Sequence, residues 1–264
     1  MLKLCVAGAA GRMGNAIIRE ATAKGYQVVG AIEAIGNHCV GKSLRELGIC
    51  DTETTIVSAD NLKEAASNAD VYVSFTAPSA EMHNIPAVAK LGKRIVLGTT
   101  GLNEEQDRQL RQAVQGEVPA VFSPNYSVGI NILFQLAKAL KSFPQEYNFS
   151  ISEVHHTGKK DAPSGTAKKI GEIIAGIRGY STVIHGREGI SPRKPNDLEI
   201  AALRVGGVPG IHDLIVAGPY EMLRIEHIAF SRSVFAQGAV YAAEWISNQT
   251  EPEIFSMENV LGLA

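Results

Sequence analysis

The sequence predicts an α/β protein of two domains, in which a doubly wound parallel sheet is joined to a second α+β domain built on a mixed sheet. Two patterns support this prediction. In the first half of the 264 residues, apolar runs of strand length alternate with amphipathic helical stretches, as in a parallel sheet covered on both faces. Beyond about residue 128, strand-like runs follow one another closely, which favours a separate α+β domain.

The strands of the first domain are expected in apolar runs at Leu2–Ala7, Gln27–Ile32, Val71–Phe75, Arg94–Gly98 and Ala120–Phe122. The clearest helix between them is Asn103–Gln115. Asn103 is a favourable N-cap, and Glu104 and Glu105 stand in the first turn, where the helix dipole stabilises acidic side chains. The alternation of strands with helices predicts that the sheet is parallel.

The second domain is expected to open with a helix from Val128 to about Lys141. Tyr147–Val154 then alternates apolar with polar residues, which is typical of an antiparallel strand with one polar face. Further strands are predicted at Leu198–Val205, Asp213–Ala217 and Met222–Ala229.

Val234–Ile246 is predicted to be a helix that returns the chain to the first domain. We therefore expect residues 1–126, with a C-terminal return at 236–264, to form the first domain. Residues 127–235 are expected to form the second domain.

The composition excludes several classes of protein. Hydrophobic residues make up 45% of the chain and charged residues 20%, with 25 Lys and Arg against 27 Asp and Glu. This balance gives no broad electrostatic reason to bind nucleic acid or an anionic membrane. The three cysteines, Cys5, Cys39 and Cys50, lack CxxC spacing, and their odd number favours reduced thiols. No secretory leader and no bilayer-spanning run stands out, so a cytoplasmic protein is expected.

A glycine-rich turn, Gly8-Ala-Ala-Gly-Arg-Met-Gly14, joins the first predicted strand to a helix. Glycines at such a turn let backbone N–H groups approach a pyrophosphate at the positive end of the helix. Glu33 ends the second strand nineteen positions after Gly14, where an acid accepts hydrogen bonds from the ribose hydroxyls of a dinucleotide. The spacing is GxxGxxG and not the strict GxGxxG, and a tight turn without a ligand is the alternative interpretation.

Two other segments, Phe75-Thr-Ala-Pro78 and Gly98-Thr-Thr-Gly101, directly follow predicted strands. In open α/β sheets, ligands bind outside the carboxyl ends of the strands. Both loops are therefore expected to border the same crevice as the glycine turn.

The most informative segment is Glu153-Val-His-His-Thr-Gly-Lys-Lys-Asp-Ala-Pro-Ser-Gly-Thr-Ala167. A predicted strand runs into two histidines and two lysines, and a Pro-Ser-Gly-Thr turn opens a helix. Potential cations beside a helix N-terminus favour an anion such as a carboxylate, and histidine exchanges a proton near neutral pH. A metal site at Glu153, His155 and His156 is the alternative, but neighbouring lysines would repel a dication, so no metal is expected.

Four motifs together resemble the dihydrodipicolinate reductase (4-hydroxy-tetrahydrodipicolinate reductase) family: GAAGRMG, GTTG, NYSVGIN at 125–131 and EVHHTGKKDAPSGTA. The resemblance covers essentially the whole chain. It implies a cytoplasmic homotetramer that transfers hydride from NADH or NADPH to 4-hydroxy-tetrahydrodipicolinate, a small dicarboxylate. The product is tetrahydrodipicolinate, with loss of water, on the diaminopimelate route to lysine. The first domain would then be a Rossmann-type domain that binds the cofactor. The second would bind the substrate and carry the subunit contacts.

The resemblance also implies roles for individual residues. His155, as proton donor or acceptor, and Lys159, as proton donor, would be the catalytic pair. His156, Gly165 and Thr166 would contact the substrate carboxylates.

On the cofactor side, the resemblance assigns the pyrophosphate to the turn made by Gly8, Ala9, Ala10, Gly11, Arg12 and Met13. Glu33 would bind the ribose hydroxyls. The residues that would flank the nicotinamide end are Gly98, Thr99, Thr100, Ser123, Pro124, Asn125 and Tyr126.

One departure from that family concerns the choice of cofactor. Several of its members carry Arg directly after the ribose-binding acid, where it can pair with a 2′-phosphate, but this chain has Ala34. The loss predicts an enzyme that prefers NADH or uses both cofactors, although Lys42 could supply the missing charge.

Two alternative interpretations stay open. One is a different oxidoreductase on a related two-domain plan, such as an amino-acid or semialdehyde dehydrogenase. A semialdehyde dehydrogenase that forms a thioester would need a nucleophilic cysteine at the domain junction, and no cysteine lies beyond position 50. A non-catalytic dinucleotide sensor would keep the glycine turn but would have no use for the His-His-Lys segment.

Overall fold

The computed structural model describes residues 1–263, and its chain forms two compact units. The first unit consists of Met1–Ser127 together with the segment that begins at Ser233, and the second consists of Val128–Arg232. None of the helices among the described residues is long and apolar enough to cross a membrane.

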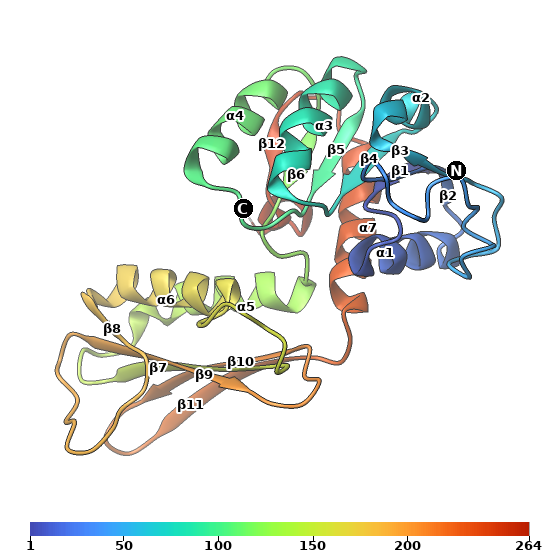
Figure 1. Ribbon diagram of the computed structural model, residues 1–264. Helices are drawn as coiled ribbons and strands as arrows, with labels where there is room; N and C mark the ends of the chain where they lie inside the picture. The colour runs from blue at the N-terminus through green and yellow to red at the C-terminus, as the bar shows by residue number, and fades with distance from the viewer. Residues whose placement is uncertain (264) are drawn as a thin grey trace. The chain divides into compact units, whose positions relative to one another are not determined.

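The first unit is built on a seven-stranded sheet in the order β12-β6-β5-β4-β1-β2-β3, and every pairing in it is parallel (Figure 1). The strands are β1 (Lys3–Ala7), β2 (Gln27–Glu33), β3 (Ile56–Ser58), β4 (Val71–Ser74), β5 (Arg94–Leu97), β6 (Ala120–Phe122) and β12 (Ile254–Phe255). The chain winds outward from β1 in both directions, which confirms the predicted doubly wound sheet. In such sheets the ligand crevice opens where the winding reverses, here between β1 and β4.

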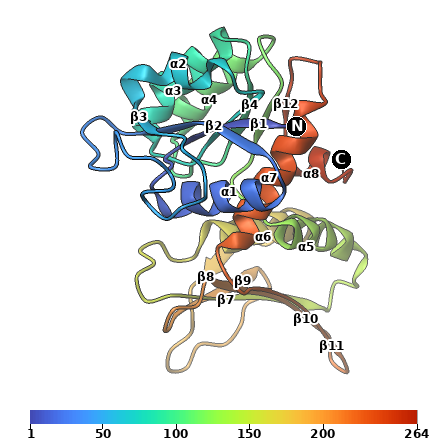
Figure 2. The same ribbon diagram turned by 90° about the vertical axis from the view of Figure 1, so that its right-hand side faces the viewer.

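Helices cover both faces of this sheet, because neighbouring residues of its strands point to opposite sides. Leu4 and Val6 of β1 join one buried cluster with α1 and α7, whereas Cys5 and Ala7 join another with α2, α3 and α4 (Figure 2). The helices are α1 (Arg12–Ala23), α2 (Leu62–Ser67), α3 (Pro78–Lys90), α4 (Glu104–Val114), α7 (Ser233–Ser247) and α8 (Met257–Val260), with a 3₁₀ turn η1 (Ala59–Asn61).

The second unit contains a five-stranded sheet in the order β11-β10-β7-β9-β8. Its strands are β7 (Asn148–His155), β8 (Thr182–Ile184), β9 (Asp197–Arg204), β10 (Gly210–Ala217) and β11 (Met222–Ala229). β7 lies antiparallel to β10 but parallel to β9, so the sheet is mixed, as predicted.

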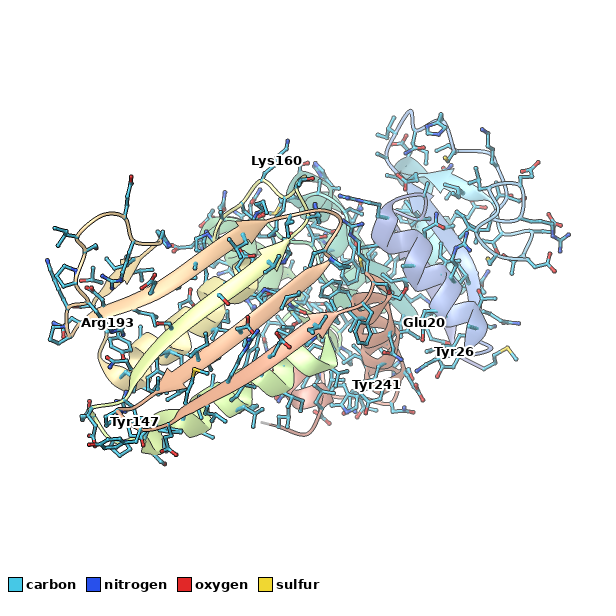
Figure 3. The ribbon with its side chains drawn as sticks, turned by 90° about the horizontal axis from the view of Figure 1, so that it is seen from below. Glu20, Tyr26, Tyr147, Lys160, Arg193 and Tyr241 are labelled. Carbon is cyan, nitrogen blue, oxygen red and sulfur yellow. The ribbon has the colours of Figure 1, made fainter. Side chains whose placement is uncertain are left out.

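One face of this sheet is covered by α5 (Val128–Ala139), its 3₁₀ extension η2 (Leu140–Ser142) and α6 (Gly165–Arg178). Figure 3 shows the sheet from its opposite face, so that its strands lie in front of these helices. Period-two alternation explains this arrangement, since Phe149 and Ile151 of β7 are buried under the helices whereas Ser150 and Ser152 face away.

Most predicted elements form within one or two residues of the expected bounds. Asn103 caps α4 through a reciprocal pair of hydrogen bonds with Gln106, as its position predicted. The exception among the strands is β10, which begins at Gly210 and not at Asp213. Its first three residues do not alternate apolar with polar side chains, but they belong to the strand because they pair with β11 and β7. β3, β8 and β12 have two or three residues each and are too short to give a periodic signal.

Candidate functional site

The glycine turn passes from β1 into α1 through backbone that only glycine accommodates. Gly8 has φ of +71°, and its N–H donates to the Ile32 carbonyl at 2.9 Å, which ties the turn to β2. A Cβ at Gly14 would lie 2.0 Å from the Gly8 carbonyl oxygen. Gly11 is the N-cap of α1 and no acidic residue stands in the first turn, so the N–H groups at this helix start are free to meet an anion.

Glu33, at the end of β2, is fixed against this turn. Its Oε1 accepts a hydrogen bond from the Ala10 N–H at 2.8 Å, and its Oε2 accepts from Asn37 Nδ2 at 3.0 Å and from the Ala34 N–H at 3.2 Å. The side chain is 8% exposed, so it is held in one place beside the glycine turn. The structure therefore brings together the glycine turn and Glu33, which were both predicted, and it adds Asn37, which no sequence pattern indicated.

The loops after β4, β5 and β6 are joined by an aromatic contact. The Phe75 ring packs so closely on Gly98 that a Cβ there would lie 2.1 Å from the ring, and the Tyr126 ring centroid is 5.3 Å from that of Phe75. The buried Tyr126 hydroxyl lies 2.8 Å from the Leu97 carbonyl. Thr99 is buried, whereas Thr100 and Pro124 are exposed. These loops all follow the carboxyl ends of adjacent parallel strands, as expected for a ligand crevice.

In the second unit, Glu153 and His155 lie two residues apart on the same face of β7 and form a buried pair. Glu153 is fully buried, and its Oε2 is hydrogen-bonded to His155 Nδ1. Arg204, which pairs with His155 in the register of β9, donates to both carboxylate oxygens of Glu153 at 2.9 and 3.0 Å. The Ser164 N–H donates to Glu153 Oε1 at 3.0 Å, which links the pair to the N-cap of α6.

These contacts define the charge and the tautomer of His155. Burial opposes ionisation of Glu153, but hydrogen bonds from Arg204 and His155 outweigh it and hold the pKa of Glu153 below its usual value. Burial also lowers the pKa of His155, although the Glu153 carboxylate acts in the opposite direction. His155 is therefore neutral at pH 7, donates from Nδ1 to the carboxylate, and keeps Nε2 as a proton acceptor. Gly210 leaves space at that atom, since a Cβ there would lie 3.1 Å from it.

The other residues of the segment lie beside this pair. Lys159 Nζ forms an ion pair with Asp161 at 2.8 Å, and its charge contributes to the lowered pKa of His155. His156 Nε2 is 3.3 Å from the guanidinium of Arg232. Gly165 and Thr166 open α6, where Gly165 is exposed and a Cβ on it would meet no atom within 4 Å. The N-cap of α6, Ser164, shares the Glu153 carboxylate with Arg204, so this helix begins near one guanidinium.

Two further residues of this region have no local sequence signal: Arg204, whose side chain is 20% exposed, and the buried His212. Arg204 lies 51 positions after Glu153, so no local spacing connects them. His212 on β10 stacks edge-on against His155 with ring centroids 5.1 Å apart, and its Nε2 lies 3.1 Å from Ser164 Oγ. Burial lowers the pKa of His212 to about 3, which keeps this ring neutral.

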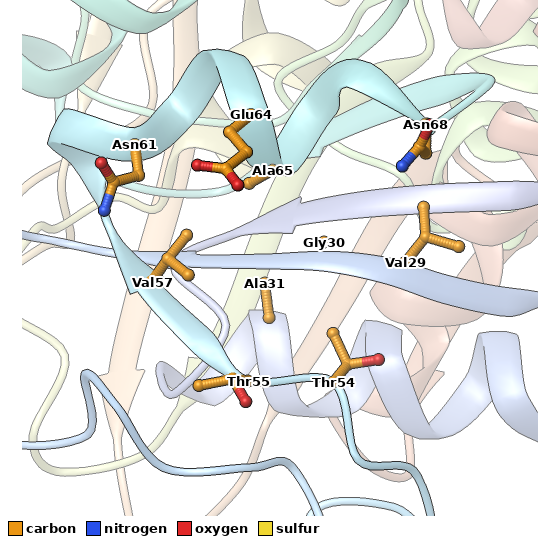
Figure 4. A pocket seen from close by; sticks show the side chains of 10 residues that line it. All are labelled: Val29, Gly30, Ala31, Thr54, Thr55, Val57, Asn61, Glu64, Ala65 and Asn68. Carbon is orange, nitrogen blue, oxygen red and sulfur yellow. The ribbon is translucent and has the colours of Figure 1, made fainter.

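Other features carry no candidate chemistry. Among residues 1–263, no group of three or more His, Cys, Asp or Glu side chains is placed to hold a metal ion. A pocket between β2, β3 and α2 is lined by side chains such as Thr54 and Asn61 (Figure 4), and none of the predicted site residues lines it. Burial raises the pKa of Cys5 to about 12, so this thiol is no nucleophile.

Comparisons with known proteins match the whole chain. The family model described as "Dihydrodipicolinate reductase, N-terminus" matches residues 2–126, and "Dihydrodipicolinate reductase, C-terminus" matches residues 129–261. The chain is 41% identical to the 4-hydroxy-tetrahydrodipicolinate reductase of Methanosarcina barkeri and 37% identical to that of Geobacter metallireducens, with 100% of each chain covered in both cases.

Solved structures share the fold. The dipicolinate-bound dihydrodipicolinate reductase from Paenisporosarcina sp. TG-14 matches with a TM-score of 0.74 at 21% identity, covering 98% of this chain and 99% of that one. The amine dehydrogenase from Mycobacterium smegmatis matches with a TM-score of 0.68 at 12% identity, covering 97% of this chain and 95% of that one.

Proposed function

This chain belongs to the dihydrodipicolinate reductase family of pyridine-nucleotide-dependent oxidoreductases, and we propose that it reduces 4-hydroxy-tetrahydrodipicolinate to tetrahydrodipicolinate in lysine biosynthesis through diaminopimelate. In this reaction one hydride and one proton enter the substrate, and one water leaves it. The observation that carries the proposal is the buried Glu153–His155 pair, set beside Lys159 and the N-terminus of α6.

The second unit has the chemistry to hold a small dianion. Removing two carboxylates from water is costly unless charged or N–H donors replace the water. Support for a carboxylate site at His156, Gly165 and Thr166 comes from the exposed Gly165 at the start of α6 and from the Arg232 guanidinium beside His156. The exposed glycine lets a carboxylate approach the backbone N–H groups without meeting a side chain.

His155 and Lys159 have complementary proton chemistry. The neutral imidazole accepts a proton at Nε2, and Glu153 stabilises the imidazolium that forms. The Lys159 ammonium supplies a proton to the substrate as negative charge develops on it. The reduced nicotinamide supplies the hydride when the cofactor is bound.

The first unit has the groups that a dinucleotide requires. The turn from Gly8 to Met13 is assigned to the pyrophosphate, and the first turn of α1 supports this, because no side chain caps it and it holds no acidic residue. Glu33, held by Ala10 and Asn37, is oriented to accept hydrogen bonds from ribose hydroxyls. The nicotinamide end would lie at Gly98–Thr100 and Ser123–Tyr126.

The carboxylate of Glu33 favours NADH over NADPH. A 2′-phosphate dianion would stand next to the fixed charge of Glu33, and the exposed Ala34 offers no positive charge to offset the repulsion. We therefore propose that this enzyme prefers NADH or uses both cofactors. Measured kcat/KM values for the two cofactors decide the point, and a clear preference for NADPH would contradict it.

We also propose that the chain forms a homotetramer in the cytoplasm, and the open face of the second sheet supports self-association. Leu203, Met222 and Ile228 are 57%, 65% and 45% exposed on β9 and β11, which is a large apolar area for a free surface. Light scattering coupled to size-exclusion chromatography measures the mass directly. A monomer at micromolar concentration would contradict this assembly.

The activity itself is tested by following NADH and NADPH oxidation with enzymatically generated substrate. We expect substrate-dependent oxidation by the wild-type chain. No oxidation with either cofactor, under conditions in which a family member turns over, would refute the proposed function.

A further inference from the structure

A buried carboxylate that the reaction does not use lies beneath the loops after β4 and β5. Glu81, in the first turn of α3, is 0% exposed. Its Oε1 accepts hydrogen bonds from three hydroxyls: Ser74 Oγ at 2.7 Å, Thr76 Oγ1 at 2.5 Å and Thr99 Oγ1 at 2.5 Å. Its Oε2 is buried and has no hydrogen-bond partner among residues 1–263.

These bonds connect two loops that are separate in sequence. Thr76 follows the end of β4, and Thr99 follows the end of β5. The Thr99 hydroxyl donates to Glu81 and also accepts from the Thr76 N–H at 2.8 Å, so the two loops are linked directly as well as through the carboxylate. Ser74 differs from the two threonines because it belongs to β4 itself and is already held by the sheet.

Stability alone does not explain this arrangement. Burying a carboxylate is costly, and one of the two oxygens lacks the hydrogen bonds that would offset the cost. The start of α3 lowers the cost, because the positive end of a helix stabilises a negative charge in its first turn. The carboxylate holds two hydroxyls on two loops in one fixed arrangement. Binding sites are preorganised for their ligands in this way.

We propose that Glu81 is a positioning residue for the nicotinamide end of the cofactor site, which it serves by holding Thr76 and Thr99 in the geometry that the bound cofactor needs. The inference rests on the proposed function, which assigns Gly98–Thr100 to the nicotinamide. Glu81 is not a catalytic residue, because it is fully buried beneath the loops, and its carboxylate accepts hydrogen bonds from their hydroxyls and from that of Ser74.

The test compares two ligands in full-length protein. NADH contains the nicotinamide, whereas ADP-ribose contains the same adenosine diphosphate ribose portion without it. In Glu81→Gln, a neutral amide replaces the carboxylate, and we expect the Kd for NADH to rise about tenfold, which is about 1.4 kcal/mol. The Kd for ADP-ribose should stay within about twofold of wild type, because the glycine turn and Glu33 are untouched.

Ser74→Ala is the matched control. It removes one hydroxyl from the same carboxylate oxygen but frees neither loop. Both Kd values should stay within about twofold. Thr76→Val, which removes a loop hydroxyl at a partly exposed position, should repeat the selective loss of NADH affinity and serves if Glu81→Gln does not fold.

The outcomes separate the inference from the function. Wild-type protein that binds neither ligand would refute the proposed function, and the inference would fall with it. Wild-type protein that binds both, with equal loss of NADH and ADP-ribose affinity in Glu81→Gln and Thr76→Val, would refute the inference alone. Unchanged NADH affinity in these variants, with only a lower melting temperature, would also refute it and assign Glu81 a structural role.

Discussion

Replacing Glu153 by Gln removes the charge that fixes His155 while keeping the shape of the side chain. The carboxylate accepts hydrogen bonds from Arg204, from the Ser164 N–H and from His155 Nδ1, and the carboxylate itself is fully buried. Glu153→Gln leaves the guanidinium of Arg204 without its counter-charge. Losing one partner of a buried pair lowers the free energy of unfolding by about 3–5 kcal/mol. We expect a loss of about 3 kcal/mol for Glu153→Gln, because the amide keeps part of the hydrogen bonding.

The catalytic effect follows from the same contacts. An amide can present N–H or C=O to the imidazole, so His155 no longer has one enforced tautomer, and the imidazolium loses its counter-charge. Positioned proton transfer contributes about 10²–10⁴-fold to rates, and we expect kcat/KM to fall at least about 100-fold. The Kd for NADH should stay within about twofold of wild type.

The pH profile gives the sharpest readout. Burial is the main cause that lowers the pKa of His155, and Glu153 acts against it. Without the carboxylate the pKa falls further, so the acid limb of the kcat/KM profile moves to lower pH. Glu199→Gln, which breaks an ion pair between β9 and Arg187 of the loop before it, is the control and should leave the profile unchanged. A variant that loses stability but keeps both kcat/KM and the acid limb would refute the role assigned to Glu153.

Three further predictions follow from the site. His155→Ala and Lys159→Ala should each lower kcat by at least about 100-fold in steady-state assays, with the Kd for NADH nearly unchanged; near-normal turnover in either variant would contradict the assignment. Ala34→Arg should raise the NADPH:NADH ratio of kcat/KM by about tenfold, because the guanidinium can pair with a 2′-phosphate, and an unchanged ratio would count against the position assigned to Glu33. Because the pKa of His212 falls from 6.5 to about 3 on folding, the unfolded state binds more protons and stability falls as pH drops below 6.5. At pH 5 the free energy of unfolding should be about 2 kcal/mol lower than at pH 7 for this reason. In urea unfolding at the two pH values, His212→Asn should lose less of this free energy than wild type, and an equal loss would contradict the role of His212.

Local patterns were sufficient to predict much of this molecule. The alternation in β7 and the capping residue Asn103 depend on neighbours in sequence, and so do the glycine turn and the cationic segment that begins at His155. The same is true of Glu33, whose distance from Gly14 is set by one β-α-β unit. Such features are visible because the forces that create them act within one element or between consecutive ones.

The contacts that fix the chemistry come from elsewhere in the chain. Arg204 reaches Glu153 because β9 pairs with β7, and that register arises only in the folded sheet. Glu81 meets Thr99 because β4 and β5 are adjacent, and in sequence it is one acidic residue in an amphipathic helix. Long-range pairing of buried polar groups has no periodic signature, so only the structure shows which charges are held together.

A crystal structure of this chain with NADH and pyridine-2,6-dicarboxylate, a stable analogue of the dianionic substrate, would place both ligands directly. We expect the carboxylates to contact His156 and the backbone N–H groups at Gly165 and Thr166, with His155 Nε2 facing the ring. We expect the pyrophosphate on the turn from Gly8 to Met13. A ring bound away from residues 155–166, or a dinucleotide bound away from the glycine turn, would refute the proposed site.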